Sequence, residues 1–114
     1  MNTYKPATGT SVYAYDPTTP FAVATAALYA STTVKEFYVA AKNLAEVNKY
    51  DLFAAMVIEG AAKTIRYRVP IVQMVLWATV ERVIREMAAK RYGEGREELL
   101  KLANNARVAS IFHS

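Results

Sequence analysis

The sequence predicts an all-α protein: a small bundle of four to five helices that follows an extended N-terminal arm. Two observations predict this fold. From residue 34 onward, apolar residues recur three and four positions apart, as in helices with one buried face. No stretch alternates between apolar and polar residues for more than a few positions. A chain of 114 residues has the length of one domain, which we divide into the arm, 1–19, and the helical bundle, 20–114.

The arm has a composition that cannot build a hydrophobic core of its own. Its sequence through residue 20, MNTYKPATGTSVYAYDPTTP, contains three prolines and shows no apolar periodicity. Ordering such a segment costs roughly 1–2 kcal/mol per residue in backbone entropy, which only extensive contact offsets. We therefore expect sister copies of the chain to hold the arm. The predicted subunit-contact residues are Tyr4, Tyr13, Tyr15, Phe21 and Trp77.

Capping signals mark the first two helices. Thr19 is a good N-cap, and Pro20 suits the first helical position, where its missing N–H costs nothing. The β-branched stretch STTV, 31–34, weakens the end of this helix. Because Thr33 and Glu36 match the capping-box pattern S/T-x-x-E, we expect the helix to kink or to restart there.

Three more helices are expected downstream. Asn48 and Asp51 look like the next cap. Pro70 then opens a helix, and Gly93 and Gly95 close it ahead of the last one.

The segment 69–80, VPIVQMVLWATV, is apolar on nearly every side, with Gln73 as its main interruption. A helix of this kind is normally buried on all sides. It is therefore expected either to be the central helix of the bundle or to face another subunit in part. Trp77 is its natural anchor in both cases.

The chain lacks the residues on which most catalytic and metal sites depend. It has no cysteine, and its only histidine is His113. It contains no Gly-rich phosphate loop, no paired-acid motif and no metal-ligand spacing. We therefore expect neither an enzyme nor a cofactor nor a metal site.

Acidic residues stand one helical turn from basic ones. Glu59 interrupts an apolar run, which allows a buried acid with a raised pKa. An ion pair with Lys63 is the simpler alternative, and we favour it. Two further pairs are expected: Glu81 with Arg85, and Glu86 with Lys90.

Positive charge is concentrated in one third of the chain. Residues 60–92 contain seven Lys or Arg and two Glu, a net charge of +5, whereas the whole chain carries +4. The densest part is KTIRYR, 63–68, where three bases flank a tyrosine at the seam between two helices. Bases near a helix C-terminus also favour the helix dipole, but this pattern suits contact with a phosphate backbone. The predicted contacts are Lys63, Arg66, Tyr67, Arg68, Arg82 and Arg85.

The uncharged segment 17–34 raises the question of a membrane. It is rich in Thr and Ala and poor in Leu and Ile, so it would gain little from lipid. Lys5 is the only base ahead of it, and Leu28 spoils a cleavage site that would end at Ala30. We expect neither a cleavable signal peptide nor contact with a membrane.

The layout of the chain resembles the small helical major capsid proteins of rod-shaped and filamentous archaeal viruses. The likeness rests on the arm, the long helices after it, the basic seam KTIRYR and the absence of cysteine and catalytic groups. It implies a subunit that lines up along a nucleoprotein filament, with N-terminal extensions that wrap DNA. Because the arm holds one base, Lys5, and one acid, Asp16, the basic residues at 63–91 would carry the DNA contact.

The expected function is therefore that of a structural, self-assembling subunit that coats DNA in a helical assembly, in a virion or inside a cell. Its partners would be copies of itself and a nucleic-acid backbone, without sequence specificity. Two alternatives stay open. One is a small helical subunit of a nucleic-acid-handling ribonucleoprotein complex, and the other is a filament or pilus subunit without nucleic acid.

Overall fold

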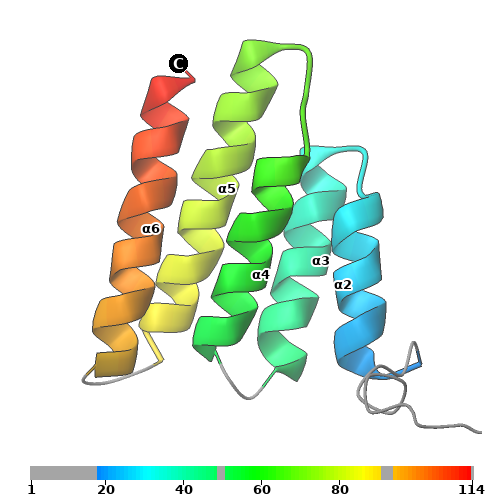
Figure 1. Cartoon of the computed structure of the whole chain (residues 1–114), viewed down its shortest axis with the longest axis vertical. Helices are drawn as coiled ribbons and strands as arrows, with labels where there is room; N and C mark the ends of the chain where they lie inside the picture. Colours follow the sequence, from blue (N-terminus) through cyan, green and yellow to red (C-terminus); the bar gives the residue numbers. More distant parts are fainter. Residues whose placement is uncertain (1–17, 49–50, 91–93, 114) are drawn as a thin grey trace, which may run out of the picture.

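A computed structural model of the chain describes residues 18–48, 51–90 and 94–113. These residues form five α-helices and no strand, which confirms the predicted all-α bundle (Figure 1). The predicted arm lies outside the described residues up to residue 17. The helices are α2 (Pro20–Ala30), α3 (Val34–Val47), α4 (Asp51–Thr64), α5 (Pro70–Ala88) and α6 (Glu94–Phe112).

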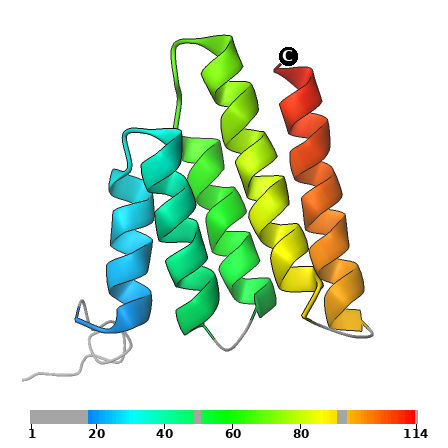
Figure 2. The same ribbon diagram turned by 180° about the vertical axis from the view of Figure 1, so that it is seen from behind.

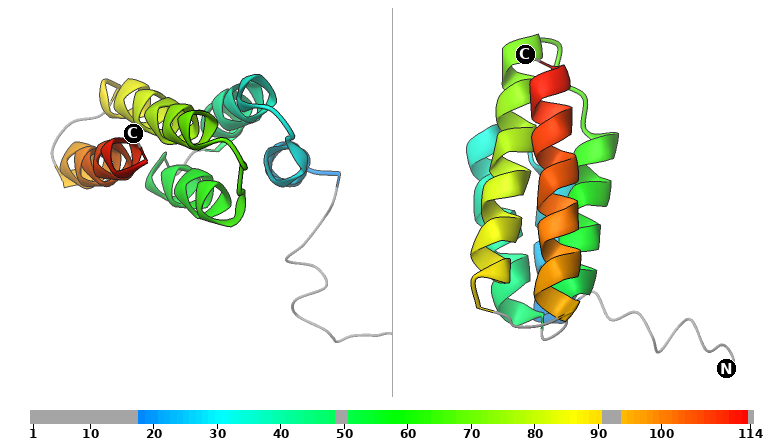
Figure 3. Two further views of the ribbon diagram at one scale, coloured as in Figure 1. Left: turned by 90° about the horizontal axis from the view of Figure 1, so that it is seen from above. Right: turned by 90° about the vertical axis from the view of Figure 1, so that its left-hand side faces the viewer.

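The helices run alternately up and down and pack in two rows. Seen from above, α3 and α5 form one row, and α2, α4 and α6 form the other (Figure 3). Helix α2 stands at one edge of the bundle, and α6, packed on α5, stands at the opposite edge (Figures 1 and 2). We call the end at the top of Figure 1 the upper end. It carries the loops 31–33 and 65–69 and the last turn of α6.

The predicted caps of the first two helices are present. The Thr19 hydroxyl accepts a hydrogen bond from the Ala22 N–H at 3.1 Å, and the Thr33 hydroxyl accepts one from the Glu36 N–H at 3.1 Å. The Glu36 carboxylate closes the second cap through the N–H of Thr32, at 2.8 Å, and the Thr32 hydroxyl. These bonds hold the pKa of Glu36 below its ordinary value. The helix therefore restarts, and the chain reverses direction between α2 and α3.

Two predicted boundaries differ from the structure. Asn48, expected to cap the third helix, ends the second: it is the C-cap residue of α3, and its N–H donates to the Leu44 carbonyl at 3.1 Å. Helix α5 ends at Ala88, earlier than the predicted glycines. Gly95 lies in the first turn of α6, and Gly93 lies outside the described residues. Capping residues alone do not distinguish the end of one helix from the start of the next.

The core lies between the two rows, and α5 supplies its largest share. One side of α5 is buried, from Gln73 through Trp77 to Met87. The opposite side of its first half is not, because Ile71 and Val75 are exposed. The first expectation is therefore met, because α5 is the central helix of the bundle. That part of it faces another subunit stays a prediction. The largest fully buried side chains are Phe37, Leu28, Leu44, Ile58, Leu76, Ile84, Leu99, Val80 and Val83.

Candidate functional site

The basic seam is a short loop that a buried glutamine holds in place. Gln73, 5% exposed in the first turns of α5, accepts a hydrogen bond from the Tyr67 N–H at 2.9 Å. Its amide also donates to the Ile65 carbonyl at 3.4 Å. The main polar interruption of the apolar segment thus forms hydrogen bonds with two backbone groups of the loop, in keeping with the rule that buried polar groups are hydrogen-bonded.

This arrangement turns the basic side chains of the loop outward. Ile65 and Tyr67 pack against the core, whereas Arg66 and Arg68 are exposed. Among the described residues, neither arginine has a carboxylate within ion-pair distance. Lys63, in the last turn of α4, pairs with Glu59 at 3.7 Å, as predicted, and stays largely exposed. Lys63, Arg66 and Arg68 all lie where α4 ends and the loop 65–69 begins, and we call these three residues the basic corner.

Tyr67 does not have the role that the sequence suggested. Its hydroxyl is buried and has no hydrogen-bond partner in the described part of the chain. Burial, with a smaller contribution from the charge of Glu36, raises the pKa of Tyr67. The phenol is therefore neutral at ordinary pH and turned away from solvent, so Tyr67 anchors the loop and offers no hydroxyl to a phosphate.

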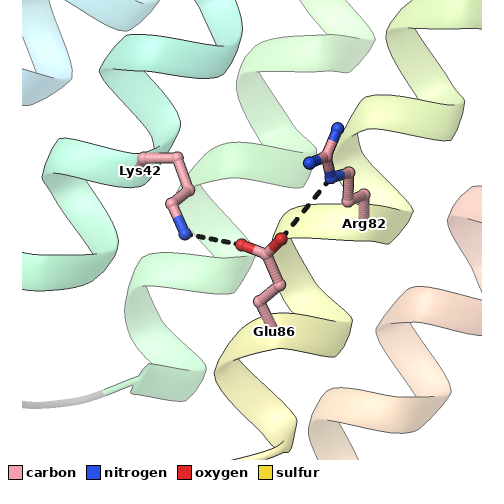
Figure 4. Close-up of polar contacts among 3 residues, drawn as sticks. All are labelled: Lys42, Arg82 and Glu86. Atoms are coloured by element: carbon pink, nitrogen blue, oxygen red, sulfur yellow. Dashed lines mark hydrogen bonds and ion pairs between the residues drawn. The ribbon is translucent and has the colours of Figure 1, made fainter.

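Arg82 lies lower on α5 and faces α3. Its guanidinium stands over the Tyr38 ring at 5.2 Å from the ring centre and pairs with Glu86 at 3.5 Å. Glu86 also pairs with Lys42 of α3 (Figure 4). The sequence predicted Lys90 as the partner of Glu86, but Glu86 instead joins two helices. The hydrogen bond from Lys42 lowers the pKa of Glu86 and raises the pKa of Lys42.

Arg85 faces the other neighbour of α5. Its Nε pairs with Glu81 at 2.8 Å, as predicted, and its Nη2 donates to Asn104 Oδ1 of α6 at 2.9 Å. Arg82 and Arg85 thus serve contacts between helices on different sides of α5. Arg82 lies about 18 Å along the helix from Pro70, at 1.5 Å per residue. The predicted set of phosphate contacts therefore does not form one surface, and these two arginines do not belong to the basic corner.

The predicted subunit-contact residues also do not lie on one surface of the described chain. Tyr4, Tyr13 and Tyr15 lie outside the described residues. Phe21 is half-buried and stacks on Phe53 of α4, with ring centres 5.6 Å apart. Trp77 is 6% exposed and belongs to the core of its own chain. A ring enclosed in this way offers almost no area to a second copy, so we remove Trp77 from the contact residues.

Helix α2 presents an apolar face that the sequence analysis did not single out. No residue of α2 is charged, yet the helix stands at the edge of the bundle. Val23 is 54% exposed and Tyr29 is 50% exposed. Beyond Pro20, the exposed residues of α2 are the following, which we call the edge face: Val23, Ala26, Ala27, Tyr29 and Ala30.

A groove of about 390 Å³ runs beside the edge face, between α2 and the first half of α3. Half of its lining residues are alanine or valine, and the other half are polar or charged. It lies toward the upper end of the bundle, because it includes the loop residue Ser31. The lining residues are Ala27, Ala30, Ser31, Lys35, Glu36, Val39, Ala40 and Asn43.

Exposed apolar side chains also occur where α5 begins and α6 ends. The Ser110 hydroxyl donates to the Met74 carbonyl at 3.0 Å and ties the two helices together there. Phe112 is 83% exposed, and Val108, one turn before it on the same side of α6, is 66% exposed. Ile71 and Val75, in the first turns of α5, are exposed as well.

Neither a metal-binding cluster nor a membrane-spanning helix is present among the described residues. Within them, acidic and histidine side chains form no group of three or more that could hold a metal ion. None of the five helices combines the length and the apolar character needed to cross a bilayer. Comparison of the chain with protein-family models, curated proteins and solved structures found no match.

Proposed function

We propose that the chain is a structural subunit that assembles with copies of itself. This proposal rests on one observation, the position of α2 at the edge of the bundle. A helix without charge normally lies inside a protein, whereas α2 stands at an edge with its outer side exposed. Apolar surface gains about 25 cal/mol for each Å² removed from water. A second copy packed on this edge supplies that gain.

The proposal extends to a nucleic acid as the material that the assembly coats. Arg66 and Arg68 favour it, since they are exposed and lie beside Lys63 without an ion-pair partner among the described residues. Guanidinium groups in this state suit phosphate oxygens, which they bind without reading sequence. The assembly would then be a virion or nucleoprotein subunit that coats DNA. A ribonucleoprotein subunit, and a filament or pilus subunit without nucleic acid, remain the alternatives.

Charge placed on the edge face tests self-assembly. We define the edge variant as Val23→Glu with Ala27→Glu. Burying an unpaired carboxylate costs several kcal/mol, so association should weaken by at least about 100-fold. The measurement is the mass in solution by light scattering, in multiples of 12.7 kDa.

A matched control variant introduces an acidic residue elsewhere on the surface. Arg96→Glu changes an exposed residue in the first turn of α6, where an acid suits the helix dipole. We expect this variant to assemble like the natural chain. If the edge variant assembles as well as the control, α2 is not an interface and the proposal fails.

The salt dependence of DNA binding tests the proposed contact with nucleic acid. Affinity for duplex DNA should fall with a log–log slope of about −0.9 for each phosphate neutralised. Replacing Lys63, Arg66 and Arg68 by Gln should make this slope less steep by about 0.9 for each phosphate that the variant no longer neutralises. The control replaces Arg82 and Arg85, which serve contacts within the bundle, and should leave the slope unchanged.

Each alternative has its own outcome in this experiment. Tight binding of single-stranded RNA with weak binding of duplex DNA would favour a ribonucleoprotein subunit. A chain that assembles but binds neither polymer at low salt would favour a filament subunit without nucleic acid. Equal slopes for the basic-corner variant and its control would remove Lys63, Arg66 and Arg68 from the interface.

A further inference from the structure

Gly60 lies inside α4, where a glycine lowers helix stability relative to alanine. The chain itself does not require a glycine there. The backbone at Gly60 is helical, and beyond the neighbouring turns of α4 the nearest atom to an added Cβ would be the Tyr29 hydroxyl oxygen, at 3.9 Å. This is an ordinary contact distance, so an alanine would fit. A glycine with open space over it suits close approach by a second molecule.

Two large apolar side chains stand on the same face of α4 as Gly60. Phe53 is 52% exposed and stacks on Phe21 of α2, which holds its ring in place, and Met56 is 55% exposed. Helix α4 stands between α2 and α6 in its row (Figure 3), and a groove of about 460 Å³ runs between α4 and α6. Positions three and four apart share one side of a helix. We therefore call four residues the α4 face: Phe53, Met56, Gly60 and Lys63.

The charges along this groove balance one another. Its lining contains two glutamates and two lysines, and they form ion pairs within the chain: Glu59 with Lys63 at 3.7 Å, and Glu98 with Lys101 at 3.3 Å. A nucleic acid therefore gains little from this surface. Two copies of the same surface can meet without the repulsion that like charges would produce.

The order of side chains along the α4 face suits a second copy of the same helix that runs in the opposite direction. With a two-fold axis at residue 58, position 56 lies opposite position 60 of the other copy, and position 53 lies opposite position 63. Each Met56 then meets a Gly60, which leaves room for it. Each Phe53 ring meets a Lys63, whose aliphatic stem can cover the ring while its charge stays in water. The α4 face is therefore complementary to itself, as an isologous contact requires.

We infer that α4 packs antiparallel against α4 of a second copy, with Met56 of each copy seated on Gly60 of the other. The contact is isologous and stops at two copies. The inference rests on the proposed self-assembly and adds a second interface to it, because the α4 face and the edge face share no residue.

An exchange of two residues tests this contact in the edge variant, Val23→Glu with Ala27→Glu, whose edge face is blocked. By sedimentation velocity the edge variant should be a dimer, with twice the mass of 12.7 kDa. Adding Gly60→Met places methionine opposite methionine and should weaken the dimer by about 10-fold or more. Adding Met56→Gly together with Gly60→Met again places one methionine opposite one glycine and should restore the dimer.

The control adds Arg107→Met to the edge variant. It puts the same side chain at an exposed position of α6 that does not line the groove, and it should leave the dimer unchanged. An exchange variant that dimerises as weakly as Gly60→Met would overturn the inferred register.

The masses also separate the inference from the proposed function. If the natural chain assembles and the edge variant is a monomer, the α4 contact is wrong while self-assembly stands. If the natural chain and the edge variant are both dimers and nothing larger, the edge face is not an interface while the α4 contact stands.

Cysteine cross-linking replaces the masses should a variant lose its helical circular dichroism. The natural chain has no cysteine. In a mixture of Met56→Cys with Gly60→Cys, disulfides should join unlike copies, because these positions lie opposite one another. Disulfides between like copies alone would indicate a parallel contact and contradict the inference.

Discussion

At the scale of single residues, Gln73 has the largest influence on the candidate site. Its side-chain amide bridges the N–H of Tyr67 and the carbonyl of Ile65 from inside the core. The two exposed arginines of the loop owe their outward direction to this bridge. The basic corner therefore depends on a residue that is uncharged and buried.

We predict that Gln73→Leu destabilises the fold by about 1–3 kcal/mol, since it leaves two backbone groups of the loop unsatisfied. Urea unfolding followed by circular dichroism measures this loss. Hydrogen exchange at the Tyr67 N–H should accelerate more than exchange in α3. The control is Thr79→Val, which removes a hydroxyl bonded within its own helix and should change stability by less than about 0.5 kcal/mol. Equal stability of Gln73→Leu and the natural chain would contradict this account of the loop.

The sequence predicts the structure correctly where a residue bonds to residues close to it along the chain. Thr19 and Thr33 cap the helices that their positions predicted, because a cap needs only the next three residues. The sequence shows Gln73 as a polar residue within an apolar segment. Its hydrogen bonds to the loop 65–69 exist only because that loop folds back over α5, which the sequence does not show. Trp77 was assigned to a subunit contact and lies in the core. Its large apolar surface suits both places, and only the packing of the other helices decides between them.

At the scale of elements, Glu86 joins α3 to α5. It pairs with Lys42 across the helix interface and with Arg82 along its own helix. The sequence predicted a pair within one helix, because i,i+4 spacing is visible in a sequence and contact across helices is not. The six predicted phosphate contacts do not form one surface for the same reason, since Arg82 and Arg85 point to different neighbours of α5.

We predict that Glu86→Gln lowers the melting temperature at pH 7 and has little effect at pH 3. The pKa of Glu86 is lowered in the folded chain, first by the hydrogen bond from Lys42. Its contribution is therefore present above the ordinary carboxyl pKa and is lost as pH falls through the lowered value. Because the group is partly exposed, the effect at pH 7 should be at most about 1 kcal/mol.

A double-mutant cycle isolates this pair. Lys42→Met and Glu86→Gln should be non-additive at pH 7, and their coupling should vanish at pH 3. The carboxylate of Glu36 also has a lowered pKa, but it is present in all four proteins of the cycle and cancels. A coupling that is equal at both pH values would mean that Glu86 does not act as a charged partner of Lys42.

At the scale of the whole molecule, the uncharged helix α2 lies at one edge of the bundle (Figure 1). The sequence showed that residues 17–34 carry no charge, but only the arrangement of the helices shows that α2 lies at an edge.

The mass of the natural chain in solution tests the central claim most directly. Sedimentation velocity over a wide range of protein concentration measures it without any substitution. Self-assembly predicts species heavier than 12.7 kDa whose mass grows with concentration, in steps of one chain. A single species of 12.7 kDa at every concentration would contradict the account.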